Sequence, residues 1–528
     1  MIKLLSLPDA LPSARPRTEV RPEEGITVPV LVVTDPATTL VNRFCRQLHQ
    51  AYRLRLATDP RVRLFEVASL AQLAAVAHAR RPAVIVNLSR HPVAALQQLL
   101  PPWALVVDFV YREADAVQVP LSRLAGRPLF IPGLRAVLRH PSTAAVTAFL
   151  HRGGGGCEGT IGQWEWRSHH KVAGRLRTAL LTGSFLVLDC FLGALHDGVA
   201  PESYGALRHV PEPREVPPAG GKLVTLTRYA WHLVQRTARL RLAPDFREQW
   251  SVGVARVPES AGGRVPDLSG TPAAVQWLIP SADRIFADPH LAAHEGQRTL
   301  FFEEKVGDAP GMIMAAPVAD DGTVQMDARV TALRTDFHLS FPFVVEHEGA
   351  PYLLPEQAAT WRVVLYRCIR FPTRWEPWVV LLDGFQGADP VLHHHEGHWY
   401  LFVSDATHGN HDNHLQLFVA PTIAGPFRRH PASPVRFGLR GSRMAGALRH
   451  TPEGLVRLGQ ECHELYGGSI SAFLVEALTP TTYRERFLRR LPPIPGDFPM
   501  AMHTHSALEG LVAVDGRRMI PRALGGTP

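Results

Sequence analysis

A short unit recurs in the C-terminal half of the chain, and this repeat constrains the fold more than any other feature of the sequence. In three copies the residue before a proline stands eight positions ahead of a glycine: Asp288 and Gly296, Phe341 and Gly349, Asp389 and Gly397. Two weaker copies place Gly446 before Gly454 and Met502 before Gly510 at the same offset. Five units of about 50 residues, each with an inner strand, a tight turn and an outer strand, predict a five-bladed β-propeller.

The N-terminal half shows a different pattern, in which buried-strand runs alternate with helical stretches. The strand-like runs are VPVLVVTD, RVRLFEV and PAVIVNLS, and the helical ones cover Asn42 to Tyr52 and LAQLAAVAHA. This alternation predicts βαβ units in an open, mostly parallel α/β sheet. We therefore expect a loose tail at 1–26, an α/β domain at 27–200, a Pro-rich linker and helix at 201–245, and the propeller at 246–528.

Charge and apolar content exclude several classes of protein. The net charge is +8, but only four of the 56 basic residues are lysines, and no Lys/Arg block or zinc-finger spacing accompanies the arginines. Arginine-rich coding explains this bias as well as a nucleic acid partner would, so we expect none. The longest apolar stretch, Ala179 to Leu195, contains Asp189 and is shorter than the roughly 20 residues that span a bilayer. We read it as a buried strand or helix segment.

The termini and cysteines favour the cytoplasm. Five scattered cysteines without a CxxC pair argue against a disulfide framework, and the N-terminus makes a poor signal peptide. A basic helix expected over Leu223 to Ala243 allows peripheral membrane contact, although packing between two domains is the commoner fate. The run of glycines at Gly153 to Gly156 reads as a flexible loop, because it matches no phosphate-binding motif.

Several blocks between about residues 245 and 525 resemble a known family. They are FADPHLAAHEGQRTLFFEEK, HLSFPFVVEHEGAPYLLPE, VVLYRCIRFPTRW, DPVLHHHEGHWYLFVSD, AGPFRRHP, LTPTTYRER and MHTHS. Together they look like the bacterial relatives of the N-terminal domain of plant glucosamine inositolphosphorylceramide transferase, which resembles the five-bladed propellers of family 43 glycosidases.

In such bacterial relatives the propeller often follows a domain similar to methionyl-tRNA formyltransferase, and residues 28–200 resemble a worn copy of it. The HxSLLP stretch and the aligned Asn, His and Asp of that family are absent, and LPPWALVVDFVYREAD stands in their place. Formyl transfer would require those residues.

Asp288 and Asp389 are the leading candidates for chemistry. They occupy the same position in two repeats, and the inner strands of a propeller converge at one mouth of its channel, so the two carboxylates should face one another. Such a pair is suited to glycoside chemistry. The resemblance implies that Asp288 is the general base and that Asp389 modulates and orients. The alternative is that each aspartate merely caps a turn before proline.

The general acid departs from the family pattern. The resemblance implies a glutamate near the start of the fourth blade, where this chain has GLRGSRMAGALRH and therefore only Arg440 and Arg443. We take Glu356 as the third catalytic candidate, and Glu461 is at the same offset from its glycine. Either one could instead be solvated.

Arg443 at the mouth would favour a sugar phosphate, a nucleotide sugar or an acidic glycan, because a guanidinium binds oxyanions bidentately. A salt bridge to one of the aspartates explains it equally well. The other predicted substrate-binding residues are His290, His338, Glu303, Gln460, His503 and His505.

No metal ligand or cofactor is assigned from the sequence. The resemblance implies that a fifth-blade histidine, His503 or His505, faces an axial metal ion or water. The loop HGNHDNH, with His408, His411 and His414, has a spacing that a metal would accept but lacks a fixed scaffold. Trp361, Trp375, Trp378 and Trp399 could stack on sugars or pack between blades.

Three functions follow in order. The first is an enzyme acting on a glycosidic bond or an activated sugar in surface polysaccharide or glycolipid synthesis, with a glycosyltransferase as one partner. The second is a binding module for a glycan or nucleotide sugar. The third is a sugar N-formyltransferase, for which the triad is missing.

Overall fold

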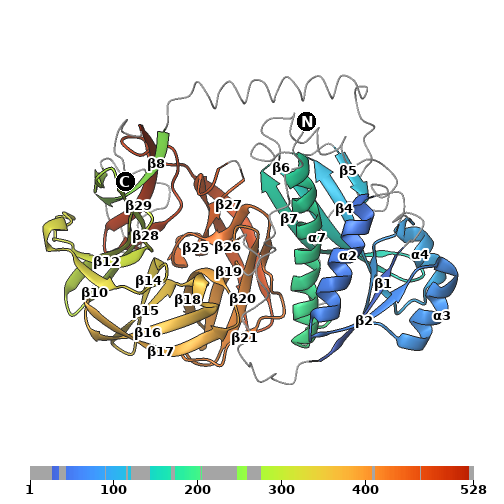
Figure 1. Cartoon of the computed structure of the whole chain (residues 1–528). Coiled ribbons are helices and arrows are strands. Elements are labelled where there is room, and N and C mark those ends of the chain that lie inside the picture. Colours follow the sequence, from blue (N-terminus) through green and yellow to red (C-terminus); the bar gives the residue numbers. More distant parts are fainter. Residues whose placement is uncertain are drawn as a thin grey trace.

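The structure is a computed structural model of the whole chain (Figure 1). It describes residues 26–34, 43–89, 91–113, 117–120, 143–167, 173–201, 204, 246–257, 275–406, 411–463 and 465–521. The expected tail and almost all of the expected linker and basic helix lie outside the described residues. The domain boundaries given above therefore stay predictions.

The N-terminal half forms one seven-stranded sheet in the order β2-β1-β3-β4-β6-β7, with β5 paired to β4. The strands are β1 Val28–Val33, β2 Val62–Val67, β3 Val84–Asn87, β4 Leu105–Glu113, β5 Val117–Pro120, β6 Thr143–Arg152 and β7 Cys157–Arg167. Helices α2 Arg43–Thr58, α3 Leu70–Arg80 and α4 Val93–Leu99 follow β1, β2 and β3 in turn.

The expectation of a mostly parallel sheet is wrong for the second half of this sheet. Pairings β1–β2, β1–β3 and β3–β4 are parallel, whereas β4–β5, β4–β6 and β6–β7 are antiparallel. The physical reason lies in the connections: a helix supplies each parallel crossover, but β6 and β7 are joined by the tight turn at Gly153 to Gly156. That glycine run is thus a hairpin turn.

Helix α7 Ala173–His196 covers this sheet and contains the long apolar stretch. Its buried residues, Phe185 and Phe191 among them, pack in one core with the strands. Asp189 is compensated, since it pairs with Arg61 at 2.5 Å. Among the described residues no helix combines the length and apolar character that a membrane crossing needs.

The C-terminal half forms five sheets, which confirms the predicted five blades (Figure 1). Blade one contains β10 Arg284–His294, β11 Gln297–Val306, β12 Met312–Pro317 and β13 Val330–Leu333; blade two contains β14 Ser340–His347, β15 Ala350–Glu356, β16 Arg362–Arg370 and β17 Arg374–Asp383. Blade three contains β18 Gly387–His395, β19 His398–Asp405, β20 His414–Ala420, β21 Arg428–Arg429 and β22 Arg436–Phe437. Short 3-10 turns occupy Met326–Ala328 and Ala358–Thr360.

Blades four and five are built less regularly. Blade four contains β23 Arg440–Met444, β24 Arg449–Thr451, β25 Gly454–Glu461, β26 Ser469–Leu478 and β27 Tyr483–Leu491. Blade five joins β28 His505–Leu508 and β29 Leu511–Pro521 to β8 Phe246–Arg256 and β9 Gln276–Trp277. Because β29 pairs with β8 along its whole length, strands from the two ends of the propeller sequence close the ring.

The repeat encodes two backbone features of the inner hairpin. At the turn, Glu396 and Gly397 have φ of 46° and 77°, as a tight type I′ hairpin requires, and blades one, two and five repeat this Glu-Gly turn. Before the proline, Asp288, Phe341 and Asp389 have φ between 44° and 52° at a bulge in the ladder. Such φ values are uncommon for residues other than glycine.

In blade four the predicted repeat position is wrong. The ladder bulge lies between Arg440 and Arg443, and the residue with positive φ there is Gly441, not Gly446. The offset of eight fails because the inner strand is divided into β23 and β24, so extra residues separate the bulge from the turn at Gly454.

The α/β sheet contacts the propeller through β7 and α7. The Asn413 side chain accepts a hydrogen bond from the Glu165 amide at 2.8 Å and donates to the Glu165 carbonyl at 3.1 Å. The Glu165 carboxylate accepts from the Leu439 amide at 2.9 Å, and Phe437 packs against the core of the sheet. Polar and apolar contacts therefore join the two halves at blades three and four.

Candidate functional site

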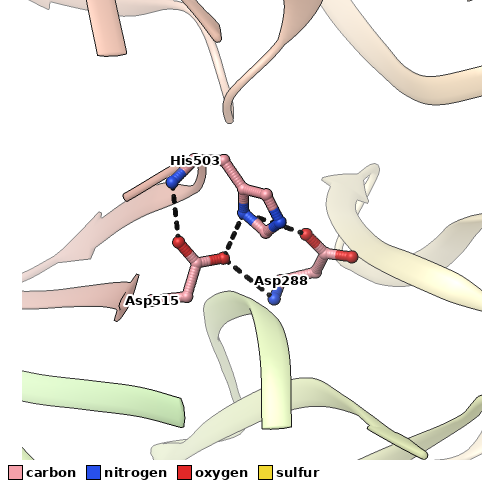
Figure 2. Close-up of side chains that lie close together, drawn as sticks. All are labelled: Asp288, His503 and Asp515. Carbon is pink, nitrogen blue, oxygen red and sulfur yellow. Dashed lines mark hydrogen bonds and ion pairs between the residues drawn. The ribbon is translucent and has the colours of Figure 1, made fainter. Parts of the chain in front are cut away.

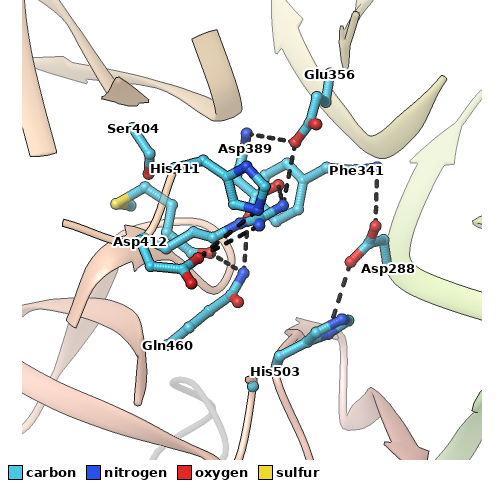
Figure 3. A network of polar contacts seen from close by, with 12 residues as sticks. Asp288, Phe341, Glu356, Asp389, Ser404, His411, Asp412, Gln460 and His503 are labelled. Atoms are coloured by element: carbon cyan, nitrogen blue, oxygen red, sulfur yellow. Dashed lines mark hydrogen bonds and ion pairs between the residues drawn. The ribbon is translucent and has the colours of Figure 1, made fainter. Parts of the chain in front are cut away.

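Five acidic side chains from four blades gather near the starts of the inner strands, and we call them the carboxylate cluster (Figure 3). Its members are Asp288, Glu303, Glu356, Asp389 and Asp515, and each is less than a tenth exposed. The predicted convergence of Asp288 and Asp389 is supported by the electrostatic effect of Asp389 on Asp288.

Backbone amides at the bulges connect the carboxylates of successive blades. The amide of Asp288 donates to Asp515 at 3.2 Å, and the amide of Phe341 donates to Asp288 at 3.2 Å. The amide of Asp389 donates to Glu356 at 3.0 Å. The left-handed backbone before each proline therefore directs an N–H at the carboxylate of the preceding blade, so these residues do more than cap their own turns.

Asp389 is held as an anion. Arg443 donates to it through Nε at 2.6 Å and through Nη2 at 3.1 Å, and Gln460 donates at 2.6 Å. Burial alone would raise the pKa of Asp389, but the Arg443 charge and hydrogen bonds hold it below its usual value. Arg443 thus forms the salt bridge that was the alternative to ligand binding, and Asp389 is suited to orienting rather than to accepting a proton.

Asp288 has a different environment, next to His503 and Asp515 (Figure 2). Thr504 donates to its Oδ1 at 3.0 Å, and His503 Nδ1 lies 3.7 Å away. Burial raises the pKa of Asp288 to about 6, although the nearby His503 opposes the shift. At neutral pH this carboxylate is mostly ionised and can accept a proton.

His503 is an imidazolium between two carboxylates. Burial would lower its pKa, but Asp515, whose Oδ2 lies 2.5 Å from Nδ1, and then Asp288 raise the pKa to about 9. Asp288, His503 and Asp515 offer ligand atoms within 4.8 Å of one another, as a metal site would. The protonated Nδ1 has no lone pair to give, so these residues fit an internal ion pair better than a metal ion.

Glu303 and Glu356 are the groups that stay protonated. Burial, followed by the charge of Asp288, raises the pKa of Glu303 to about 8. Burial and Asp389 raise the pKa of Glu356 well above its usual value, against the effect of Arg443 at 3.3 Å. Both are therefore candidate proton donors. His338 lies 3.5 Å from Glu303, which places that predicted residue beside the cluster.

The structure adds residues that the sequence did not single out. Trp250 stacks on His503 with ring centroids 4.2 Å apart, and Tyr466 lies under the Arg443 guanidinium at 5.3 Å. Asp515 and Thr504 complete the surroundings of Asp288. Asp515 falls outside the repeat offset and Trp250 precedes the first repeat, so no sequence signal points to them; Thr504 lies within MHTHS and was passed over for its two histidines.

Other predicted residues lie elsewhere. His290 donates or accepts at the Val344 carbonyl, 2.9 Å away, and His505 contacts Arg449. Glu461 lies in a separate cavity of about 280 Å³ on blade four, which removes it as an alternative acid in the cluster. That cavity is lined by Arg436, Arg440, Glu461, His463, Ser471, Phe473, Phe487 and Arg490.

The histidine loop and the tryptophans divide between several surroundings. His408 lies outside the described residues, His411 stands near Tyr466, and His414 contacts Cys190 of α7 at 3.3 Å. Trp375 and Trp399 are buried, as packing between blades predicts, whereas Trp378 is 39% exposed.

Residues 273–489 match the family described as glucosamine inositolphosphorylceramide transferase 1, N-terminal. The similar curated proteins are glucosamine inositolphosphorylceramide transferase 1 from Oryza sativa subsp. japonica, 34% identical over 204 residues, and from Arabidopsis thaliana, 33% identical over 212 residues. These matches cover 38% and 39% of this chain and 27% of each relative. The chain thus spans about a quarter of the length of these relatives, and the predicted resemblance is confirmed for this region.

Two solved structures with weak overall similarity are glycoside hydrolases. A family 117 enzyme from Zobellia galactanivorans has a TM-score of 0.34 at 12% identity and covers 51% of this chain and 90% of its own. The GH43_1 enzyme from Xanthomonas citri, complexed with xylotriose, has a TM-score of 0.31 at 16% identity and covers 40% and 78%. At these scores the likeness carries no argument about activity.

Proposed function

We propose that this protein acts on a glycosidic bond or an activated sugar at the carboxylate cluster, in the synthesis of a glycolipid or surface polysaccharide. The observation that carries the proposal is the division of the carboxyl groups into an ionised set and a protonated set. Environments that push the pKa values of neighbouring acids apart are typical of acid–base catalysis.

In this proposal each group has one role. Asp288 accepts a proton from the attacking water or hydroxyl group, because it is ionised at neutral pH. Glu303 donates a proton to the leaving oxygen, and Glu356, the candidate chosen from the sequence, is the second possible donor. Asp389, fixed by Arg443 and Gln460, orients the sugar. The names of the plant relatives support a sugar transfer to a lipid as the wider setting.

The charge balance changes the ligand class expected from Arg443. Its Nε and Nη2 already bind Asp389 and Glu356, and its Nη1 lies 3.7 Å from Asp412. An acidic ligand would compete with these carboxylates. The cluster therefore favours the uncharged hydroxyl-bearing part of a sugar over a phosphate in direct contact with Arg443.

A binding module is the second candidate, and the salt bridge of Asp389 favours it, because that carboxylate is already occupied. The formyltransferase-like activity has no comparable support. The α/β sheet does contain one buried polar pair, in which Asn87 donates to Asp108 at 3.2 Å at the end of β3. The cytoplasmic location and a glycosyltransferase partner remain predictions.

The deciding experiment compares wild type with Asp288→Asn on a panel of nucleotide sugars and aryl glycosides. The enzyme proposal predicts turnover by wild type and a loss of about 10²-fold or more in the variant. Asp383→Asn, an exposed aspartate on blade two, serves as the control and should retain full turnover. Saturable binding without turnover by wild type would identify the binding module instead.

A further inference from the structure

One buried guanidinium in the propeller has no counter-charge among the described residues. Arg449 lies on β24, the inner strand of blade four, and is 8% exposed. The other buried arginines each pair with a carboxylate: Arg443 with Asp389 at 2.6 Å, Arg457 with Glu485 at 2.7 Å and Arg517 with Glu248 at 3.0 Å. Within the described chain no acidic side chain forms an ion pair with Arg449.

Two polar atoms at this place have no hydrogen-bond partner. Arg449 uses Nη2 to donate to the His505 carbonyl at 3.2 Å, while its Nη1 is buried without a partner. His505 is 9% exposed on β28, the inner strand of blade five, and its Nδ1 is also buried without a partner. A guanidinium N–H and an imidazole N–H are thus available side by side where two inner strands meet.

The electrostatics at this place call for negative charge. Burial lowers the pKa of Arg449 to about 10, and no nearby charge counteracts it. Burial and then Arg449 lower the pKa of His505 well below its usual value. A buried charge is costly unless it is paired, so a negative partner would stabilise the folded state. An axial metal cation facing His505, as the sequence suggested, would be repelled by Arg449.

We propose that a small inorganic anion of the charge and size of chloride binds between Arg449 Nη1 and His505 Nδ1. It would neutralise the guanidinium and link the inner strands of blades four and five. The site is distinct from the carboxylate cluster, and it does not depend on the proposed carbohydrate chemistry. The same groups would also accept the acidic group of a sugar ligand, and the test separates these two sources.

The first test is thermal unfolding of the full chain in sodium chloride and in sodium gluconate at equal ionic strength. We expect a saturable rise of a few degrees in the unfolding temperature with chloride, because a ligand of the native state stabilises it. Arg449→Met should abolish this response. Arg517→Met, which removes a buried arginine that has its own carboxylate, should keep it.

An identical unfolding temperature in both salts, or an unchanged chloride response in Arg449→Met, would overturn the proposal. So would stabilisation of wild type by glucuronic acid or a sugar phosphate, through Arg449, together with indifference to chloride. The second test needs no variant: crystals of wild type soaked in bromide should show an anomalous peak within hydrogen-bond distance of Arg449 Nη1. An ordered water at that position in place of bromide would contradict the assignment.

Discussion

At the scale of the residue, two aspartates with the same backbone conformation have been given different chemistry by their neighbours. Asp389 receives three charge-assisted or amide hydrogen bonds from Arg443 and Gln460, which favour its ionised form. Asp288 has only Thr504 and the Phe341 amide as donors, and burial dominates its pKa. The side chains on neighbouring strands, rather than the shared D-P motif, therefore set the role of each aspartate.

The pH dependence of turnover should be bell-shaped. Activity rises through about pH 6 as Asp288 loses its proton, and falls through about pH 8 as Glu303 loses its own. Glu303→Gln should lower kcat by about 10²- to 10⁴-fold and remove the limb near pH 8. Measurement of kcat against pH, with the exposed turn variant Glu295→Gln as control, checks this. An unchanged alkaline limb would assign the proton donor to Glu356.

Arg443 should also be essential for stability. Arg443→Met leaves the buried Asp389 and Glu356 beside each other without a cation, which we expect to cost about 3–5 kcal/mol of unfolding free energy. Arg443→Lys keeps the charge but loses the bidentate contact, so its cost should be smaller. Urea unfolding measures both.

The control for this comparison is Arg440→Met on the same strand. The Arg440 side chain is 62% exposed and its carboxylate partner, Glu461, is 4.0 Å away, so its removal should change the unfolding free energy by less than about 1 kcal/mol. Equal stability of Arg443→Met and wild type would mean that Asp389 and Glu356 simply take up protons.

At the scale of the element, each inner hairpin combines a strained bulge with a tight turn. The bulge aims a backbone N–H at the previous blade, and the Glu-Gly turn reverses the chain within two residues. The spacing of eight between the two features is kept wherever the inner strand is continuous. In blade four the strand is interrupted, Gly441 replaces the aspartate at the bulge, and the spacing is lost.

The turn of blade three offers a paired test of this geometry. Gly397→Ala forces a side chain into φ of 77°, and we expect it to reduce stability by about 1–2 kcal/mol, although no neighbouring atom obstructs the new Cβ. Glu396→Asn should raise stability by some tenths of a kcal/mol, since asparagine is preferred at this turn position. Chemical unfolding of both variants checks the opposite signs, and a loss of stability in Glu396→Asn would show that the turn is not type I′ in solution.

At the scale of the whole molecule, the α/β sheet is docked on blades three and four rather than tethered beside them. The Asn413 amide pairs with the Glu165 backbone as a neighbouring strand would, and Cys190 and His414 meet across the same contact. Arg429 adds an ion pair with Asp197 at 2.7 Å. These groups come from residues more than 200 positions apart in the chain, so they couple the two halves.

Asn413→Ala removes two hydrogen bonds across this contact and leaves the Glu165 amide and carbonyl unpaired. We expect the single thermal transition of wild type to separate into two, because the halves then unfold independently; each lost bond is worth about 1 kcal/mol. Calorimetry checks this. The control is Ser433→Ala, which loses a hydrogen bond to Leu417 inside blade three and should shift the transition without dividing it. One undivided transition in Asn413→Ala would show that apolar contacts such as Phe437 suffice.

The sequence by itself determined the features that depend on local patterns. Strands and helices of the α/β half follow from apolar periodicity, and five blades follow from the repeat, because turn chemistry and alternation act within a few residues. Tertiary structure alone decided the antiparallel half of the first sheet, the register of blade four and the partners of each carboxylate. Asp515, Trp250 and Tyr466 reach Asp288 and Arg443 from distant strands, and a pKa depends on burial and on such neighbours. A local pattern contains neither.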